Sequence, residues 1–222
     1  MNGAWDHLRG WWQGRGAPAG ADDSRQRWVV VDVETSGLDA HHDRLLAVAA
    51  IGLDVDVDRR RIEVVPGDSF EVVLRQEAVS TRDNILLHGI GERRQRDGMD
   101  PVQALQAFAD FAGDSPLLAF HSAFDQTLID RHVRRHLGRP LPNRWLDIAD
   151  LCAVTHDTVR ARTLDDWMSH FHIPCLARHQ ASADTLATAE LLLRIWPRVV
   201  QQGARWQDLE RLAGHRRWLP EP

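Results

Sequence analysis

The sequence has no lysine, only two cysteines and no apolar run long enough to cross a membrane. Its longest apolar stretch, from Leu45 to Ile51, is far shorter than the roughly 20 residues of a membrane-spanning helix. Residues 1–7 also lack the basic-then-apolar order of a secretory signal peptide. Cys152 and Cys175 are too few for a disulfide framework and lack the spacing of metal ligands. We therefore expect a cytoplasmic protein with reduced thiols and no membrane partner.

The absence of lysine means that all 27 basic residues are arginines, and 32 acidic residues outnumber them to give a formal net charge of -5. This charge opposes simple electrostatic binding of nucleic acid. Arginine guanidinium groups can nevertheless bind phosphates with two hydrogen bonds at once. Several arginines are clustered in the sequence: Arg59–Arg61, Arg93 and Arg94 with Arg96, Arg131 with Arg134 and Arg135, and Arg216 with Arg217. Each cluster is equally compatible with a solvated surface.

The length of 222 residues, with 43% hydrophobic and 27% charged residues, is typical of a globular protein with one large domain. Residues 28–200 are predicted to form that domain, and residues 201–222 a C-terminal helical tail. Residues 1–27 are predicted to form an N-terminal stub and a flexible linker, because glycine, alanine and proline dominate residues 14–27. In the stub, Trp5, Leu8 and Trp12 share one face of a short helix. This face could dock on the domain itself or on a protein partner.

Hydrophobic periodicity predicts strands first and helices later. Apolar runs indicate strands at residues 28–33, 44–57 and 70–74, the last two separated by a turn at Pro66–Asp68. Asp100 and Pro101 form a helix start for residues 101–112, and a strand at 116–120 leads into a helix at 122–138 that Ser122 can cap. Further helices are expected at 146–156, after a Thr163 cap with Asp166 three residues on, and at 181–196. The order predicts an α/β domain built on a mixed sheet.

The segment Asp32-Val33-Glu34-Thr35-Ser36-Gly37-Leu38 ends the first predicted strand. Successive side chains of a strand point to opposite faces, so Asp32 and Glu34 share one face. Two anions held this close either have raised pKa values or bind a divalent cation. Four fixed letters in the pattern Asp-x-Glu-Thr-x-Gly make a chance match rare.

Two further acidic positions are ambiguous when each is taken alone. Asp125 follows the fourth predicted strand, where it could bind a metal or complete a capping box with Ser122. His179 and Asp184 stand five residues apart at the start of the last long helix. With twelve histidines in the chain, that spacing is uninformative by itself.

The three motifs together, in this order and on these elements, resemble those of the DnaQ-like 3'-5' exonucleases of the DEDD family, in the subgroup with histidine. They are Asp-x-Glu-Thr-x-Gly from Asp32, Ala-Phe-Asp ending at Asp125, and His-x-Ala-x-x-Asp from His179 to Asp184. The resemblance covers about residues 28–196, includes Leu87-His88-Gly89-Ile90, and extends to the proofreading exonuclease domain of the bacterial DNA polymerase III epsilon subunit. It implies a ribonuclease H-like α/β fold, with a mixed five-stranded sheet flanked by helices.

The same resemblance implies a metal-dependent 3'-5' exonuclease that releases nucleoside 5'-monophosphates. Two Mg2+ or Mn2+ ions would be held by four carboxylates, with His179 as general base and a binding site for the terminal nucleotide nearby. The implied metal ligands are Asp32, Glu34, Asp125 and Asp184, and the implied substrate-binding residues are Thr35, Leu38 and His88. Single-stranded DNA is the first choice of substrate and short RNA the second. A polymerase-associated proofreading module, acting mainly in complex, is the alternative.

Overall fold

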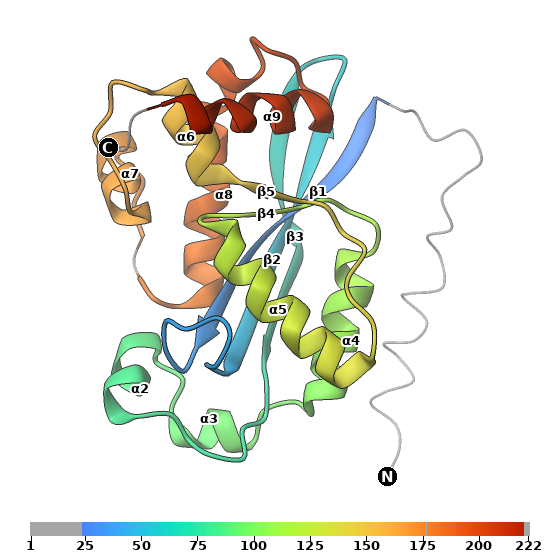
Figure 1. Ribbon diagram of the computed structural model, residues 1–222, viewed down its shortest axis with the longest axis vertical. Helices are drawn as coiled ribbons and strands as arrows, with labels where there is room; N and C mark the ends of the chain where they lie inside the picture. The colour runs from blue at the N-terminus through green and yellow to red at the C-terminus, as the bar shows by residue number, and fades with distance from the viewer. Residues whose placement is uncertain (1–23, 176, 220–222) are drawn as a thin grey trace, which may run out of the picture.

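The computed structural model describes residues 24–175 and 177–219, and it shows a five-stranded sheet flanked by helices (Figure 1). The strands are β1 (Arg25–Thr35), β2 (Leu45–Asp56), β3 (Arg61–Val73), β4 (Leu117–Ala119) and β5 (Trp145–Asp147). Their order across the sheet is β3-β2-β1-β4-β5. The first three strands pair antiparallel, whereas β1 with β4 and β4 with β5 pair parallel. The predicted mixed five-stranded sheet is therefore confirmed.

The α-helices are α2 (Arg82–His88), α3 (Glu92–Arg96), α4 (Pro101–Ala112), α5 (Ser122–Leu137), α6 (Ile148–Thr155), α7 (Leu164–Phe171), α8 (Ala181–Val199) and α9 (Trp206–Ala213), followed by the 3-10 helix η1 (Gly214–Trp218). No helix in the described ranges is long and apolar enough to cross a membrane. Most of the predicted N-terminal stub and linker lies outside the described residues. The proposed division into stub, domain and tail stays a prediction.

The sheet separates two hydrophobic cores, and alternate side chains of β1 point into one core and then the other. Val29, Val31 and Val33 pack into the core formed with α4 and α5. Trp28 and Val30 pack into the opposite core, which contains residues of α6, α7, α8 and α9. Because side chains repeat every second residue along a strand, Asp32 and Glu34 extend the row that faces α8.

Two of the predicted helix starts have the local chemistry expected from the sequence. The Asp100 side chain accepts a hydrogen bond from the backbone N–H of Val102, and Pro101 occupies the first turn of α4. Thr163 and Asp166 form a reciprocal capping box at the start of α7. These caps satisfy backbone donors that have no partner inside the helix. Both predictions are confirmed.

The predicted turn at Pro66–Asp68 is wrong, because these residues lie inside β3. Gly52 on β2 pairs with Val65, and its neighbour Ile51 pairs with Ser69. The residues from 66 to 68 thus form a bulge without partners on β2. A Cβ atom at Gly52 would come within 1.9 Å of the Asp68 carboxylate, which also pairs with Arg27 at 2.6 Å.

The helix predicted from residue 146 begins later, because residues 145–147 form strand β5. Leu146 is buried, and it pairs with Leu118 of β4. The helix α6 starts at Ile148, and the side chain of Asp147 accepts a hydrogen bond from the backbone N–H of Ala149 at 2.8 Å. A strand of three residues is too short to show a period of two in the sequence.

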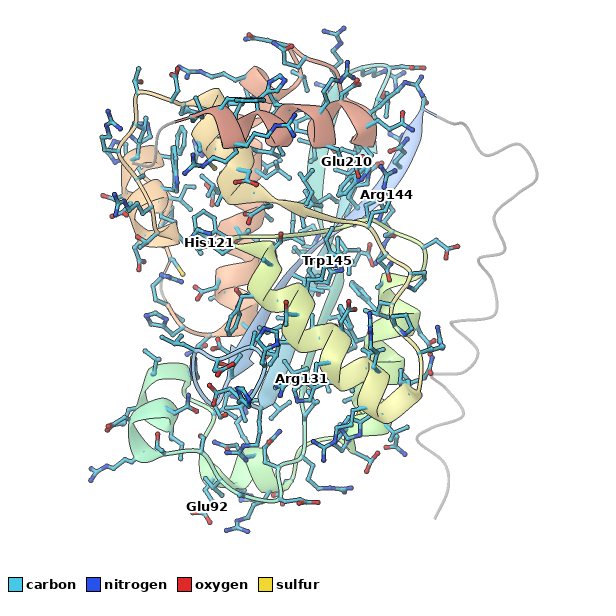
Figure 2. All side chains as sticks on the ribbon, in the orientation of Figure 1. Glu92, His121, Arg131, Arg144, Trp145 and Glu210 are labelled. Atoms are coloured by element: carbon cyan, nitrogen blue, oxygen red, sulfur yellow. The ribbon has the colours of Figure 1, made fainter. Side chains whose placement is uncertain are left out.

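The α9 helix packs across the end of the sheet opposite to α2 and α3 (Figure 1). The Trp206 ring meets Trp28 edge-on, with 5.2 Å between ring centroids, and Trp196 also meets Trp28 edge-on, with 6.0 Å between centroids. Arg144, just before β5, binds Glu210 of α9 with a 3.0 Å hydrogen bond from Nε (Figure 2). The C-terminal segment therefore shares the core of the sheet.

Two histidines are expected to make the fold sensitive to acid. Burial lowers the pKa of both His132 and His156 from 6.5 to about 4. His132 accepts a hydrogen bond from the backbone N–H of Leu45 at 3.3 Å and binds the carbonyl of Leu128 at 2.8 Å. Protonation removes that acceptor. Between pH 6.5 and about 4 the unfolded chain binds protons that the folded chain does not. The free energy of unfolding therefore decreases as the pH is lowered through this range.

Urea unfolding at several pH values between 7 and 4 measures this effect. We expect the two histidines to account for a loss on the order of 2 kcal/mol each. The double variant His132→Gln, His156→Gln should lose less stability over the same range. Equal slopes for the wild type and this variant would contradict the prediction.

Candidate active site

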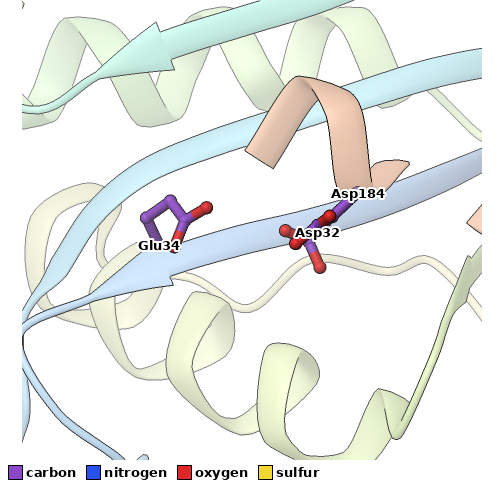
Figure 3. Close-up of side chains that lie close together, drawn as sticks. All are labelled: Asp32, Glu34 and Asp184. Atoms are coloured by element: carbon purple, nitrogen blue, oxygen red, sulfur yellow. The ribbon is translucent and has the colours of Figure 1, made fainter. Parts of the chain in front are cut away.

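The first two carboxylates of the site come from the end of β1. Asp32 pairs with Ala49 of β2, and Glu34 pairs with Ala47, so the two acids are held in register against small side chains. Glu34 is buried, with 4% of its surface exposed. The predicted convergence of these two side chains on one face is present (Figure 3).

The third carboxylate comes from α8, which packs on β1 and β2. Asp184 lies in the first turn of this helix and is buried. One carboxylate oxygen each of Asp32, Glu34 and Asp184 lies within 4.8 Å of the other two. Figure 3 shows Asp184 approaching Asp32 from the helix. Tertiary packing thus brings together acids from distant parts of the sequence.

Asp125 belongs to α5, and the capping box with Ser122, the alternative to a metal-binding role, is absent. The helix begins at Ser122, and His121, with φ of 61°, occupies the cap position (Figure 2). The carboxylate of Asp147 accepts hydrogen bonds from the backbone N–H groups of His121 at 3.0 Å and Ser122 at 3.1 Å. Asp147 therefore provides the cap, and the charge of Asp125 acts on the nearby Asp32.

Burial and mutual repulsion oppose the ionisation of all the acidic side chains in and beside the cluster at once. Burial raises the pKa of Asp32 well above its usual value, and the charges of Asp125, Glu34 and Asp184 raise it further. Burial also raises the pKa of Glu34 and Asp125. Such a cluster either retains protons or binds cations.

The residues present fit a divalent cation. Mg2+ and Mn2+ prefer carboxylate oxygens as ligands. The buried Oε1 atom of Glu34 has no hydrogen-bond partner among the described residues, which is costly unless another group binds there. A metal ion at Asp32, Glu34 and Asp184 would provide that partner and neutralise the repulsion.

His179 lies at the edge of the cluster and is exposed. It precedes the α8 cap with φ of 61°, and its backbone N–H donates to Oδ2 of Asp184 at 3.0 Å. The five-residue spacing between the two therefore corresponds to a direct contact. His179 is near enough to Glu34 for its charge to lower the pKa of that carboxyl.

The predicted substrate-binding residues surround the end of β1. Thr35 is buried, and its hydroxyl donates to the carbonyl of Gly37. Leu38 has 93% of its surface exposed on the following loop. His88, at the end of α2, contacts Glu34 through its Nδ1 atom and Oε2 of the carboxylate. The side chain of Asn84 holds α2 in place by donating to the carbonyl of Thr35 at 2.7 Å.

Sequence reasoning missed three residues at this site: Asn84, Asp147 and Arg178. Asp147 had a signal, because an aspartate directly before an apolar helix is a common N-cap. Asn84 and its partner Thr35 are 49 residues apart, and no local sequence pattern predicts their contact. Arg178 is adjacent to His179 in the sequence, and its guanidinium contacts Asp184.

Comparison with known proteins places this geometry in context. The chain is 27% identical over 184 residues to the PolC-type DNA polymerase III of Bacillus subtilis (strain 168), a match that covers 82% of this chain but only 12% of the relative. It is 30% identical over 180 residues to a DNA polymerase III subunit epsilon-like protein of Rhodobacter capsulatus, covering 79% of this chain and 24% of that protein. The chain thus spans only a small part of these relatives.

Solved structures share the fold. Exonuclease I of E. coli in complex with a dT13 oligonucleotide matches with a TM-score of 0.63 and 18% identity, covering 79% of this chain and 43% of that one. The model of the exonuclease family (RNase_T) matches residues 29–192, which is most of the chain. The chain therefore belongs to this exonuclease family, and the resemblance to DnaQ-like 3'-5' exonucleases drawn from its motifs is confirmed.

Proposed function

We propose that this protein hydrolyses DNA from the 3' end and requires two Mg2+ or Mn2+ ions. The observation that carries the proposal is the convergence of Asp32, Glu34 and Asp184 to within 4.8 Å in a member of an exonuclease family. Carboxylates at this spacing suit a two-ion site, in which metals about 4 Å apart stabilise the attacking and leaving oxygens.

Each acidic residue has a defined part in this proposal. Asp32, Glu34 and Asp184 would hold one ion, and Asp32 would also be a ligand of the second; the ions would activate the attacking water and bind the substrate phosphate. Asp125 acts largely through water. Bound ions would lower the pKa of water and neutralise charge on the phosphoryl group.

His179 is proposed to act as the general base. Its exposed position beside the cluster leaves the ring accessible to water and substrate, and its backbone bond to Asp184 ties the residue to a metal ligand. The oxygen of the attacking water would bond to phosphorus as its proton moves to the imidazole, and the bond from phosphorus to the 3' oxygen would break. The 3' oxygen would take a proton from solvent, so the shortened strand keeps a 3'-hydroxyl and a nucleoside 5'-monophosphate leaves.

The terminal nucleotide is proposed to bind against Thr35, Leu38 and His88. Leu38, exposed on the loop that follows β1, offers an apolar surface to a base. His88 would have to leave Glu34 or share it with the metal in order to contact the nucleotide. Single-stranded DNA is the first candidate, because exonuclease I, which shares this fold, has been solved with DNA oligonucleotides. Short RNA is the second.

A proofreading module that acts mainly in complex with a polymerase is the alternative. The relatives named as DNA polymerase III PolC-type and epsilon-like proteins favour it. Docking through the tryptophan-rich stub stays a prediction from the sequence, because the stub lies outside the described residues. The cytoplasmic location also stays a prediction.

Labelled oligonucleotides separate these possibilities. Purified protein is incubated with 3'-labelled and 5'-labelled DNA and RNA in Mg2+, Mn2+ or chelator. We expect 5'-labelled single-stranded DNA to shorten progressively from its 3' end only with metal. Activity in chelator would contradict the metal requirement, and preferred cleavage of RNA would reverse the choice of substrate. Stable co-purification with a polymerase and negligible activity alone would favour the proofreading alternative.

Metal binding is also expected to stabilise the fold. A ligand that binds only the folded state raises stability by about 2.7 kcal/mol when present at 100 times its dissociation constant. The thermal midpoint of the chelator-treated protein should therefore rise by roughly 5–10 °C with saturating Mn2+. Sodium chloride of equal ionic strength is the control. No rise with either Mn2+ or Mg2+ would count against the carboxylate cluster as a metal site.

A further inference from the structure

Arg178 connects two helices through two carboxylates. Its Nε atom donates to Oδ1 of Asp165 in the first turn of α7 at 2.6 Å. Its Nη1 atom contacts Oδ1 of Asp184 in the first turn of α8. The side chain is 23% exposed, and the Asp184 side chain is only 9% exposed, so this second contact is partly shielded from water.

Both carboxylate oxygens of Asp184, which a metal ion would use, already have partners. Oδ1 binds the guanidinium of Arg178, and Oδ2 accepts the backbone N–H of His179 at 3.0 Å. Asp184 is also one of the three carboxylates that converge on the candidate metal site. An incoming divalent cation must therefore share this carboxylate with the guanidinium or displace it.

The guanidinium also acts on the cluster at longer range. Its positive charge lowers the pKa of Asp32, opposing the burial and the three neighbouring acids that raise it. A positive charge that stabilises the ionised cluster also repels a second cation approaching the same oxygens. Direct occupation and repulsion thus act in the same direction.

We propose that Arg178 is a built-in cation that occupies Asp184 in the metal-free protein and competes with the divalent ion, thereby setting the metal affinity of the site. This inference rests on the proposed metal site. The Asp165 contact does not involve the metal cluster, so it can hold the displaced side chain close to the site.

Titration of the chelator-treated full chain with Mn2+, followed by calorimetry or by the electron paramagnetic resonance of free Mn2+, tests the inference without any activity measurement. In Arg178→Gln the competitor is gone, and we expect Mn2+ to bind about 10-fold more tightly, as for the loss of one partly buried charge pair. Arg178→Lys keeps the charge but loses the planar fork that spans two carboxylates. It should give a smaller increase, and it serves as a second variant if Arg178→Gln does not fold.

Arg194→Gln is the matched control. Arg194 lies on α8, the helix that carries Asp184, and pairs with Glu190 at 2.8 Å; neither Arg194 nor Glu190 belongs to the carboxylate cluster. We expect its Mn2+ affinity to equal that of the wild type. Equal or weaker Mn2+ affinity in both Arg178 variants would overturn the inference while leaving the metal site intact. Absence of Mn2+ binding in the wild type and in every variant would instead remove the metal site, and this inference with it.

Discussion

Asparagine at position 32 is expected to reduce exonuclease activity by about 1,000-fold or more while making the metal-free protein more stable. Asp32 is the carboxylate proposed to bind both ions, and the stabilisation that metal ions give to the transition state is worth several kcal/mol. The Asp32→Asn side chain keeps the shape but loses the charge. Rates on 5'-labelled single-stranded DNA with saturating Mn2+ measure the first effect.

The gain in stability has an electrostatic cause. Burial and the neighbouring acids raise the pKa of Asp32, so this residue destabilises the metal-free fold as the pH rises above the pKa of the unfolded chain, and the loss is complete above the raised pKa. Asparagine removes this cost, and each kcal/mol recovered raises the thermal midpoint by about 2–4 °C. Asp58→Asn, at an exposed position between β2 and β3, should change neither the activity nor the midpoint. Full activity in Asp32→Asn, or a lower midpoint in chelator, would contradict this assignment.

The second large effect is expected for His179→Gln. Removing a general base lowers the rate by about 100- to 10,000-fold. Mn2+ binding should persist, because the histidine ring is not among the three converging carboxylates. The measurements are single-turnover rates at saturating metal and the Mn2+ dissociation constant of the same preparation.

The pH profile separates catalysis by His179 from a structural role. With the wild type, the rate should rise with pH as a base loses its proton, whereas the variant should lose that dependence. His179→Asn is a useful control, because asparagine tolerates the positive φ of this position. Its backbone N–H can therefore still bind Asp184, as that of His179 does. A wild-type rate in His179→Gln would require a different proton acceptor.

Much of the site was predictable because it depends on local periodicity. The alternation of β1 alone places Asp32 and Glu34 on one face, and this requires no knowledge of the partner strands. The caps at Asp100 and Thr163 were equally readable, since the residues that form them lie within three positions of one another.

Other features could not be predicted from the sequence, because the residues that form them are far apart in the chain. The cap of α5 comes from Asp147, which lies 26 residues beyond His121, so the capping role predicted for Ser122 is wrong. Strand β5 has only three residues and needs β4 beside it to be recognised. The bulge at Pro66–Asp68 has the composition of a turn, and only the pairing of β2 with β3 reveals that the strand continues.

The amino-acid sequence by itself determined the kinds of groups available and the faces on which they lie, because side-chain direction follows from backbone periods of two and 3.6 residues. Tertiary structure alone decided which groups meet. The packing of α8 on β1 brings Asp184 to Asp32 and Glu34. Such contacts depend on distances between elements far apart in the chain, and no local pattern of residues encodes those distances.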